Sequence, residues 1–395
     1  MAISKISANM IDGSLTSSLV TGTLPAVSGV ALLNAGGGID TETTSDPLIT
    51  SNPSGGVGTL WLNTTSGELF NCQLATTDNN VWINIGSGLG DIAKPFGGLG
   101  GGTTSGYSAG GGAPVQDTIE KYSFASSIVV SDHGNLAMGR DGCGSCSSAT
   151  DGYAIGGFVN GPPVSPSGSA WRENIDRFSF ASNTTATDHG DMTAGRVRPS
   201  GCSSSTKGYC VGGALVSNAQ TNIIDTFTFG SNSNATDHGD MSMAGRADGT
   251  GQSSNTHGYH SGGVGTGSSD RLNIIDKFAF ASNVTGTDHG DLTVSRSYCG
   301  GHSSITHGYT VGGQSASANL DIIDRFTFSS ATNANDVGNL TRTTVAIATS
   351  SSTTQGFTAG GGSDVIDKYN FASFVTTTDH GDLAASEAGG TGFQV

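Results

Sequence analysis

The chain has 395 residues, of which 63 are glycine and 12% are charged, and its formal net charge is −16. This excess of acids opposes binding to nucleic-acid phosphates and offers no basic stripe to an anionic membrane. No apolar run approaches the roughly 20 residues of a membrane span, and residues 1–19 lack the apolar core of a secretory signal. We therefore expect a protein folded in a cytoplasm, with no nucleic-acid partner and no membrane insertion.

Residues 1–51 are low in charge, are interrupted by glycine and proline, and show no helical period. This composition predicts an extended arm that becomes ordered only when it docks on a partner.

Residues 52–90 predict a small β-meander. The segment TLWLNTTSGELFNCQL contains two alternating strands around a Thr-Ser-Gly turn, and NVWINIG adds a third strand. About 37 residues bury too little surface to be comfortably stable alone. We expect this meander to pack on copies of itself or on another protein.

An internal repeat occupies residues 94–395. The pattern Gly-aromatic-x-x-Gly-Gly occurs six times, and a basic residue precedes the aromatic residue by 13 positions in five of the copies and by 15 in the last. Six units of about 50 residues follow from this register. They begin near residues 94 (Lys94), 140, 196, 246, 296 and 342, and their aromatic residues are Tyr107, Tyr153, Tyr209, Tyr259, Tyr309 and Phe357.

Each unit predicts four short strands. A run of tiny residues is followed by the strand GYxxGG, by an alternating strand such as IIDRFTF, and by a block such as NATDHGDMT. Four strands in about 50 residues, repeated six times, are typical of a β-propeller, whose innermost strands need small side chains. We therefore expect an all-β protein, with an extended arm and a small β-meander before a six-bladed propeller.

The third strand of each unit predicts one apolar and one polar face. In IIDRFTF the isoleucine and phenylalanines share one face, whereas the aspartate, arginine and threonine share the other. Basic residues recur at this place beside an acid, at positions 121, 177, 277, 325 and 368. The alternation predicts that these charged residues form a solvated face.

The repeat resembles the kelch repeat in its arginine, Ser-rich strand, Gly-Tyr-x-x-Gly-Gly strand and IDxF strand. The tryptophan that kelch repeats carry on the fourth strand is missing, and the Asp-His-Gly block stands in its place. This variant is similar to glycine-rich kelch-like repeats in structural proteins of marine tailed phages, especially cyanophages. Residues 52–88 are also similar to a segment of phage tail-fibre and other appendage proteins.

The resemblance implies a virion protein that is assembled in the host cytoplasm and has no catalytic role. A tail fibre or appendage is expected, which docks on other virion proteins through residues 1–51, forms a homo-oligomer with a trimer favoured, and attaches to a host-surface glycan or protein. The alternative is a decoration protein of the capsid, neck or baseplate, whose propeller cements its neighbours.

The Asp-His-Gly block could be a cation site, an Asp–His base or a structural turn. A repeated motif distributes the same groups around a ring, whereas catalysis needs different groups at one site. Asp and Gly suit a turn, and the histidine can bond a neighbouring strand or blade. We interpret the block as the turn and lock of each blade, with no metal and no cofactor. The residues assigned to this role are His133, His189, His238, His289 and His380, together with the repeat tyrosines.

Loops that follow the second strand vary in length and are candidates for a binding surface. They are 158–174, 214–222, 264–273 and 314–321, and all are expected on one face. Ordinary drift of loop sequence is the competing explanation. The longest insertion supplies the candidate contact residues Asn160, Pro162, Pro163, Trp171 and Arg172.

Overall fold

The computed structural model describes residues 39–65, 68–84, 104–112, 114–126, 130–159, 171–267, 270–373 and 377–395. This part of the chain is all-β and contains no helix, hence none that could cross a membrane. The chain divides into two compact units, residues 1–92 and 93–395, which are described separately.

The first unit is built on one four-stranded sheet, β1-β2-β3-β4. The strands are β1 (Thr41–Thr43), β2 (Leu60–Asn63), β3 (Leu69–Leu74) and β4 (Val81–Asn84). The predicted meander is present in β2, β3 and β4, which pair antiparallel. The sheet begins earlier than the sequence predicted, because β1 pairs parallel with β2 although it lies within the predicted arm. The remainder of that arm, residues 1–38, lies outside the described residues.

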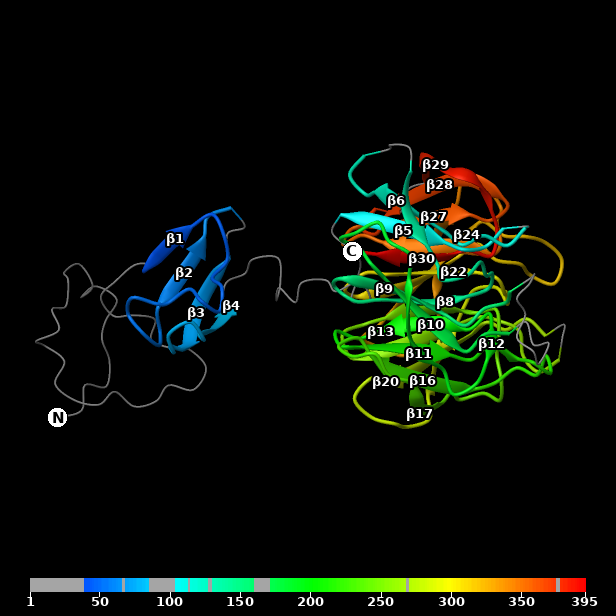
Figure 1. Cartoon of the computed structure of the whole chain (residues 1–395), viewed down its shortest axis with the longest axis horizontal. Coiled ribbons are helices and arrows are strands. Elements are labelled where there is room, and N and C mark those ends of the chain that lie inside the picture. Colours follow the sequence, from blue (N-terminus) through cyan, green and yellow to red (C-terminus); the bar gives the residue numbers. More distant parts are fainter. Residues whose placement is uncertain are drawn as a thin grey trace, which may run out of the picture. The chain divides into compact units, whose positions relative to one another are not determined.

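The second unit contains six four-stranded antiparallel sheets, numbered I to VI here (Figure 1). In the order of strand pairing, sheet I consists of β30 (Thr391–Gln394), β5 (Ser105–Ala109), β6 (Thr118–Ser123) and β7 (Ser131–Asn135), and sheet II of β8 (Gly144–Ser147), β9 (Asp151–Ile155), β10 (Asn174–Ser179) and β11 (Thr187–Asp191). Sheet III consists of β13 (Ser200–Ser203), β14 (Lys207–Val211), β16 (Ile223–Thr228) and β17 (Thr236–Asp240), and sheet IV of β18 (Thr250–Ser253), β19 (His257–Ser261), β20 (Ile274–Ala279) and β21 (Thr287–Asp291). Sheet V consists of β22 (Gly300–Ser303), β23 (His307–Val311), β24 (Ile322–Thr327) and β25 (Asn335–Asn339), and sheet VI of β26 (Ile347–Ser351), β27 (Gln355–Gly360), β28 (Ser363–Asn370) and β29 (Thr378–Glu387). A short ribbon, β12 (Arg196–Val197) with β15 (Ala214–Leu215), follows sheet II.

The first strand of sheet I comes from the carboxyl terminus. The sequence predicted a first unit that starts near residue 94, but β5 pairs with β30 (Figure 1). Lys94 lies outside the described residues. Glu387 takes the repeat position that Lys94 was expected to fill. It stands four residues before β30, as Arg140 stands four residues before β8. Sheets II to VI each fall within one predicted unit, and only sheet I takes its first strand from another part of the chain.

The first strands of the six sheets contact one another in succession, from β8 to β13, β18, β22, β26 and β30 and back to β8. Their small side chains allow this approach, as the sequence predicted. A Cβ added at Gly251 would collide with the backbone oxygen of Gly201 on the preceding sheet, and one at Gly201 would collide with that of Ser145.

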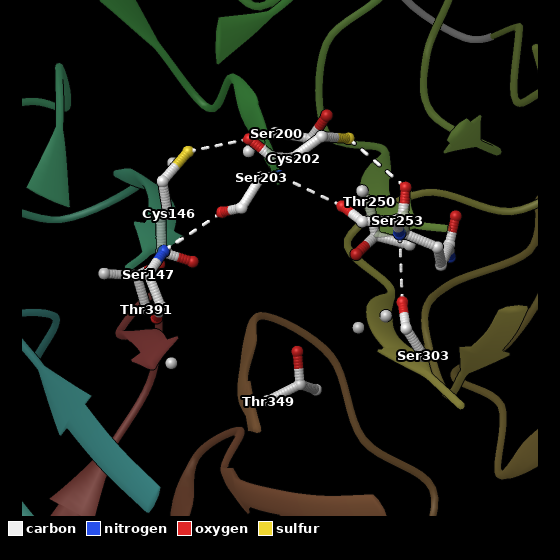
Figure 2. A pocket seen from close by; sticks show the side chains of 18 of the residues that line it. Cys146, Ser147, Ser200, Cys202, Ser203, Thr250, Ser253, Ser303, Thr349 and Thr391 are labelled. Atoms are coloured by element: carbon white, nitrogen blue, oxygen red, sulfur yellow. Dashed lines mark hydrogen bonds between the residues drawn. The ribbon is translucent and has the colours of Figure 1, made fainter. Parts of the chain in front are cut away.

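One serine hydroxyl on each of these strands accepts a hydrogen bond from the backbone N–H of the preceding sheet (Figure 2). In sheet I a glutamine carbonyl takes the place of the serine hydroxyl. The bonds close a ring, with N to O distances of 3.0 to 3.3 Å. Its members are Ser147, Ser203, Ser253, Ser303, Ser351 and Gln394.

Apolar packing also runs from sheet to sheet. Each of the six clusters of buried apolar side chains draws on two successive sheets, and one of them joins Phe357, Ile366 and Leu383 of sheet VI to Tyr122 and Phe124 of sheet I. Both faces of every sheet are consequently covered.

This covering corrects the prediction of a solvated face for the third-strand aspartates, whereas the basic residues at 121, 177, 277, 325 and 368 are half-buried. The aspartates at this position are 0 to 2% exposed, because the end of the preceding sheet covers them. A register shift follows the isoleucine in every third strand and turns the aspartate toward the repeat arginine of the preceding sheet. The resulting ion pairs are Arg140–Asp176, Arg196–Asp225, Arg246–Asp276, Arg296–Asp324 and Arg342–Asp367.

Candidate binding face

The variable loops fold back on the segments that follow the repeat arginines. Phe158 bridges to Asp141 and Trp171, and Val264 bridges to Ala247 and Arg271. Equivalent bridges or ladders occur at residues 197, 214 and 220 and at 297, 314 and 319. The loops and the connections between sheets therefore share one edge of the second unit. We call this edge the connector face.

A second closed ring of hydrogen bonds lies on the connector face. In each connection one backbone N–H donates to the carbonyl of the equivalent residue in the preceding connection, at 2.7 to 3.2 Å. The six residues all have a positive φ, between 53° and 77°. They are Gly142, Arg198, Asp248, Tyr298, Ala346 and Gly389. Four of them are not glycine. Residues other than glycine rarely adopt a positive φ, and those that do are often found at functional sites.

Three large side chains of this ring form one cluster. The Arg198 side chain is 50% exposed and its Nε lies 3.3 Å from the carboxylate of Asp248. Its Nη1 donates to the Tyr298 hydroxyl at 3.2 Å, and its guanidinium lies 5.2 Å from the centre of the Tyr298 ring. Burial raises the pKa of Asp248 to about 6, against the opposing effects of Arg198 and Arg271. The positive charge is thus held over the aromatic face and beside a partly desolvated carboxyl group.

The cluster borders a hollow of about 630 Å³ that is surrounded by the six connections. A second hollow of about 330 Å³ shares Asp141, Arg198 and Asp248 with the first and extends between the loops of sheets II and III. Trp171, Asn218 and Gln220 line this extension. Together the two form a recess with aromatic, amide, carboxyl and guanidinium groups.

Of the five contact residues predicted in the long insertion, the structure describes Trp171 and Arg172. Asn160, Pro162 and Pro163 lie outside the described residues. The Trp171 ring lies edge-on to Phe158, with the ring centres 5.6 Å apart. Arg172 bonds through its backbone, from its N–H to Gly157 and from its carbonyl to the N–H of Arg196.

Sequence reasoning missed Arg198, Asp248 and Tyr298. Each stands two residues after a repeat arginine, in the segments RVR, RAD and RSY. The available signal was a large side chain directly before the run of tiny residues that had been assigned to the first strand. A large residue at that place lies outside the packed strand and is free to serve another role.

The histidines of the Asp-His-Gly blocks join neighbouring sheets. The Nε2–H of each donates to a carbonyl at the end of the third strand of the next sheet, at 2.7 to 2.9 Å. The acceptors for His133, His189, His238, His289 and His380 are Ser179, Thr228, Ala279, Thr327 and Ser123. The aspartate of each block accepts from the N–H of the glycine two residues later, as in an Asx turn.

The repeat tyrosines serve the same junctions. Their rings stack on a phenylalanine of the next sheet with centres 4.6 to 4.8 Å apart, and their hydroxyls donate to the carbonyl of that phenylalanine. Tyr107, Tyr153, Tyr209, Tyr259 and Tyr309 are all 0 to 1% exposed. Their contacts are internal to the unit.

Among the described residues, no group of three or more His, Cys, Asp or Glu side chains is placed to hold a metal ion. The six cysteines are free thiols, and burial raises the pKa of Cys143 and Cys202 to about 12. Comparison with models of protein families and with curated proteins finds no match.

Proposed function

We propose that residues 93–395 form a closed six-bladed propeller of kelch-like repeats, in which sheets I to VI are the blades. Two rings of hydrogen bonds support closure, because both return from the sixth sheet to the first. One of the six apolar clusters joins the same two sheets. In such a propeller the connector face is one mouth of the central channel.

We propose that this propeller is the binding part of a virion appendage of a tailed phage. The observation that carries the proposal is the recess on the connector face, where variable loops surround a hollow on a rigid ring. Loops on a rigid scaffold are a common way to build a binding site. The phage assignment rests on the resemblance of the repeats and of residues 52–88 to virion proteins.

A host-surface glycan is the ligand that suits the recess. Tyr298 and Trp171 offer ring surface to sugar C–H groups, whereas Asn218, Gln220 and Asp141 offer planar donors and acceptors to hydroxyl pairs. The hollow is large enough for a small oligosaccharide, since ligand sites are typically about 300–1,000 Å³. The mixture of one guanidinium with several carboxyl groups favours a neutral polyhydroxyl ligand over a strongly charged one.

The first unit is suited to attachment. Its exposed large apolar side chains include Leu48, Val57, Leu74, Val81 and Ile83, which are 46 to 66% exposed. Val81 and Ile83 share one face of β4, and contiguous exposed apolar surface marks interaction sites. We propose that copies of the same unit cover it in a homo-oligomer, a trimer by the resemblance, and that the arm docks on the virion.

A glycan array probed with the full chain tests the binding role. We expect binding to particular oligosaccharides that falls at least about tenfold in Tyr298→Ala and in Asn218→Ala, since each removes a contact of about 1.4 kcal/mol or more. Ile305→Ala is the matched control, because Ile305 is 63% exposed and lies outside the recess. Absence of binding, or an equal loss in the control, would contradict the glycan assignment.

A decoration protein that cements its neighbours is the alternative role. A map of the intact virion distinguishes the two, because an appendage leaves the connector face free, whereas a cement protein buries it. The same map shows whether residues 1–51 dock on the particle.

A further inference from the structure

The junction between sheets VI and I differs from the other five in its buried charges. At each of the five, a repeat arginine of one sheet reaches the third-strand aspartate of the next, as Arg296 Nη2 reaches Asp324 at 2.8 Å. In four of these pairs both side chains are 0 to 3% exposed. An arginine–aspartate pair is therefore the rule between successive sheets.

Two glutamates occupy these places in the sixth junction. Glu387 lies eight residues after Asp379, as Arg196 lies eight residues after Asp188. Glu120 takes the aspartate position on β6, because the backbone N–H of Ala384 donates to its carboxylate at 3.2 Å. The equivalent N–H of Thr193 donates to Asp225 at 3.1 Å. The charge of the arginine is thus reversed at this one place, and its partner stays acidic.

Little surrounds this pair that could neutralise it. Both glutamates line a small cavity of about 180 Å³ between the two sheets, and Ser108 of β5 donates to Glu387 at 2.8 Å. The other ionisable groups that act on the pair are Asp132 of β7, beside Glu120, and Tyr122 of β6, beside Glu387. Strand β28 meets Glu387 through the backbone of Ser363. No lysine or arginine of the described residues forms an ion pair with either glutamate.

The junction is also where the chain closes on itself. Glu387 ends β29, and the chain continues directly into β30, whose pairing with β5 completes sheet I. Two like charges beside this cavity repel each other, whereas one charge and one protonated carboxyl do not.

We propose that the junction between sheets VI and I is a pH-sensitive seam. With one carboxyl of the Glu120–Glu387 pair protonated the seam is closed, and with both ionised β30 separates from β5 more readily than any other first strand separates from its sheet. The inference concerns closure and does not depend on the binding role proposed above.

The sign follows from the direction of the pKa changes. Burial, with the charge of Glu120, raises the pKa of Glu387 to about 7, and burial also raises the pKa of Glu120. An open seam exposes Glu387 to water, where its pKa is about 4.3. The closed form therefore holds the proton more tightly, so closure is favoured at low pH and weakens as the pH rises from about 4.3 through 7.

Hydrogen–deuterium exchange on the full chain tests the seam. Between about pH 5.5 and pH 8.5, after correction for intrinsic exchange, the opening of β30 and β5 should increase about thirtyfold, the ratio given by the two pKa values. The amides of β14 and β16 in sheet III provide the internal reference, because these strands carry no histidine. Equal pH dependence in the two sheets would overturn the proposal.

Variants separate the carboxyl pair from other effects of pH. Glu387→Gln should remove the pH dependence at β30, since glutamine does not ionise. Asp364→Asn, which removes an exposed acid from β28, should leave it unchanged. If Glu387→Gln does not fold, Glu120→Gln serves instead, and it should reduce the thirtyfold response without abolishing it, because burial alone still raises the pKa of Glu387. A thirtyfold response that persists in a folded Gln variant would also refute the seam.

Discussion

At the residue scale, the histidine that five of the six sheets carry in the Asp-His-Gly block shows what a repeat position contributes. Five blocks place Nε2–H on a carbonyl of the next sheet and the ring edge-on to the repeat aromatic, as His289 does with Thr327 and with Tyr259, whose ring centre is 5.0 Å away. Sheet V carries Val337 at this position, where the valine packs against the apolar cluster instead. Closure tolerates one such exchange because the other contacts of that junction remain.

Replacing His289 with alanine should therefore destabilise the fold without abolishing it. We expect a loss of about 1–3 kcal/mol in the free energy of unfolding, because the carbonyl of Thr327 loses its donor inside the junction. Urea unfolding monitored by tryptophan fluorescence or circular dichroism measures it.

The reverse exchange is the matched control. Val337→His should restore the missing donor and raise stability by about 1 kcal/mol. A stability unchanged by His289→Ala would show that the histidine is not a lock and would reopen the cation-site hypothesis.

At the scale of elements, the first strands combine glycine with serine for separate reasons. Glycine lets neighbouring backbones approach, and the serine hydroxyl accepts a hydrogen bond from a backbone N–H of the preceding sheet. Ordinary strand propensity disfavours both residue types. Packing around a common centre overrides that preference here.

A methyl group at Gly251 should consequently be poorly tolerated. It would collide with the carbonyl oxygen of Gly201, so we expect Gly251→Ala to lower stability by about 3 kcal/mol or to prevent folding. Gly230→Ala is the control, since nothing lies within 4 Å of a Cβ at that exposed turn. Similar melting temperatures for the two variants would contradict close approach of the first strands.

At the scale of the molecule, closure depends on the last residues of the chain. Gln394 of β30 belongs to the ring of hydrogen bonds among the first strands. Gly389, in the connection before β30, belongs to the ring of hydrogen bonds on the connector face. The carbonyl of Val395 also accepts from Thr104 and Ser105. Removal of these residues opens the unit at one junction.

Deletion of residues 390–395 should reduce stability far more than loss of a free chain end would. We expect a lower unfolding midpoint and a broader transition, because sheet I loses a strand and sheets VI and II lose a neighbour. Differential scanning calorimetry and analytical ultracentrifugation measure the change. An unaltered midpoint would contradict closure through β30.

The sequence by itself determined the strands of the second unit, their grouping in fours and the small first strand, because strand periodicity, glycine pairs and the repeat are local signals. It also indicated the bonding of the Asp-His-Gly block, since an Asx turn is local. Its failure at the first strand of sheet I and at the third-strand aspartates has one cause. Which side chains meet there depends on contacts between sheets that are far apart in the sequence.

Only the tertiary structure decided how the chain ends are used and which charges are buried. Pairing of β30 with β5 joins the two ends of the second unit, and this brings Glu387 to the place where other junctions hold an arginine. A half-buried sheet would leave the aspartates in water, but neighbouring sheets cover both faces. The recess around Arg198, Asp248 and Tyr298 exists because the ring brings six separate connections together.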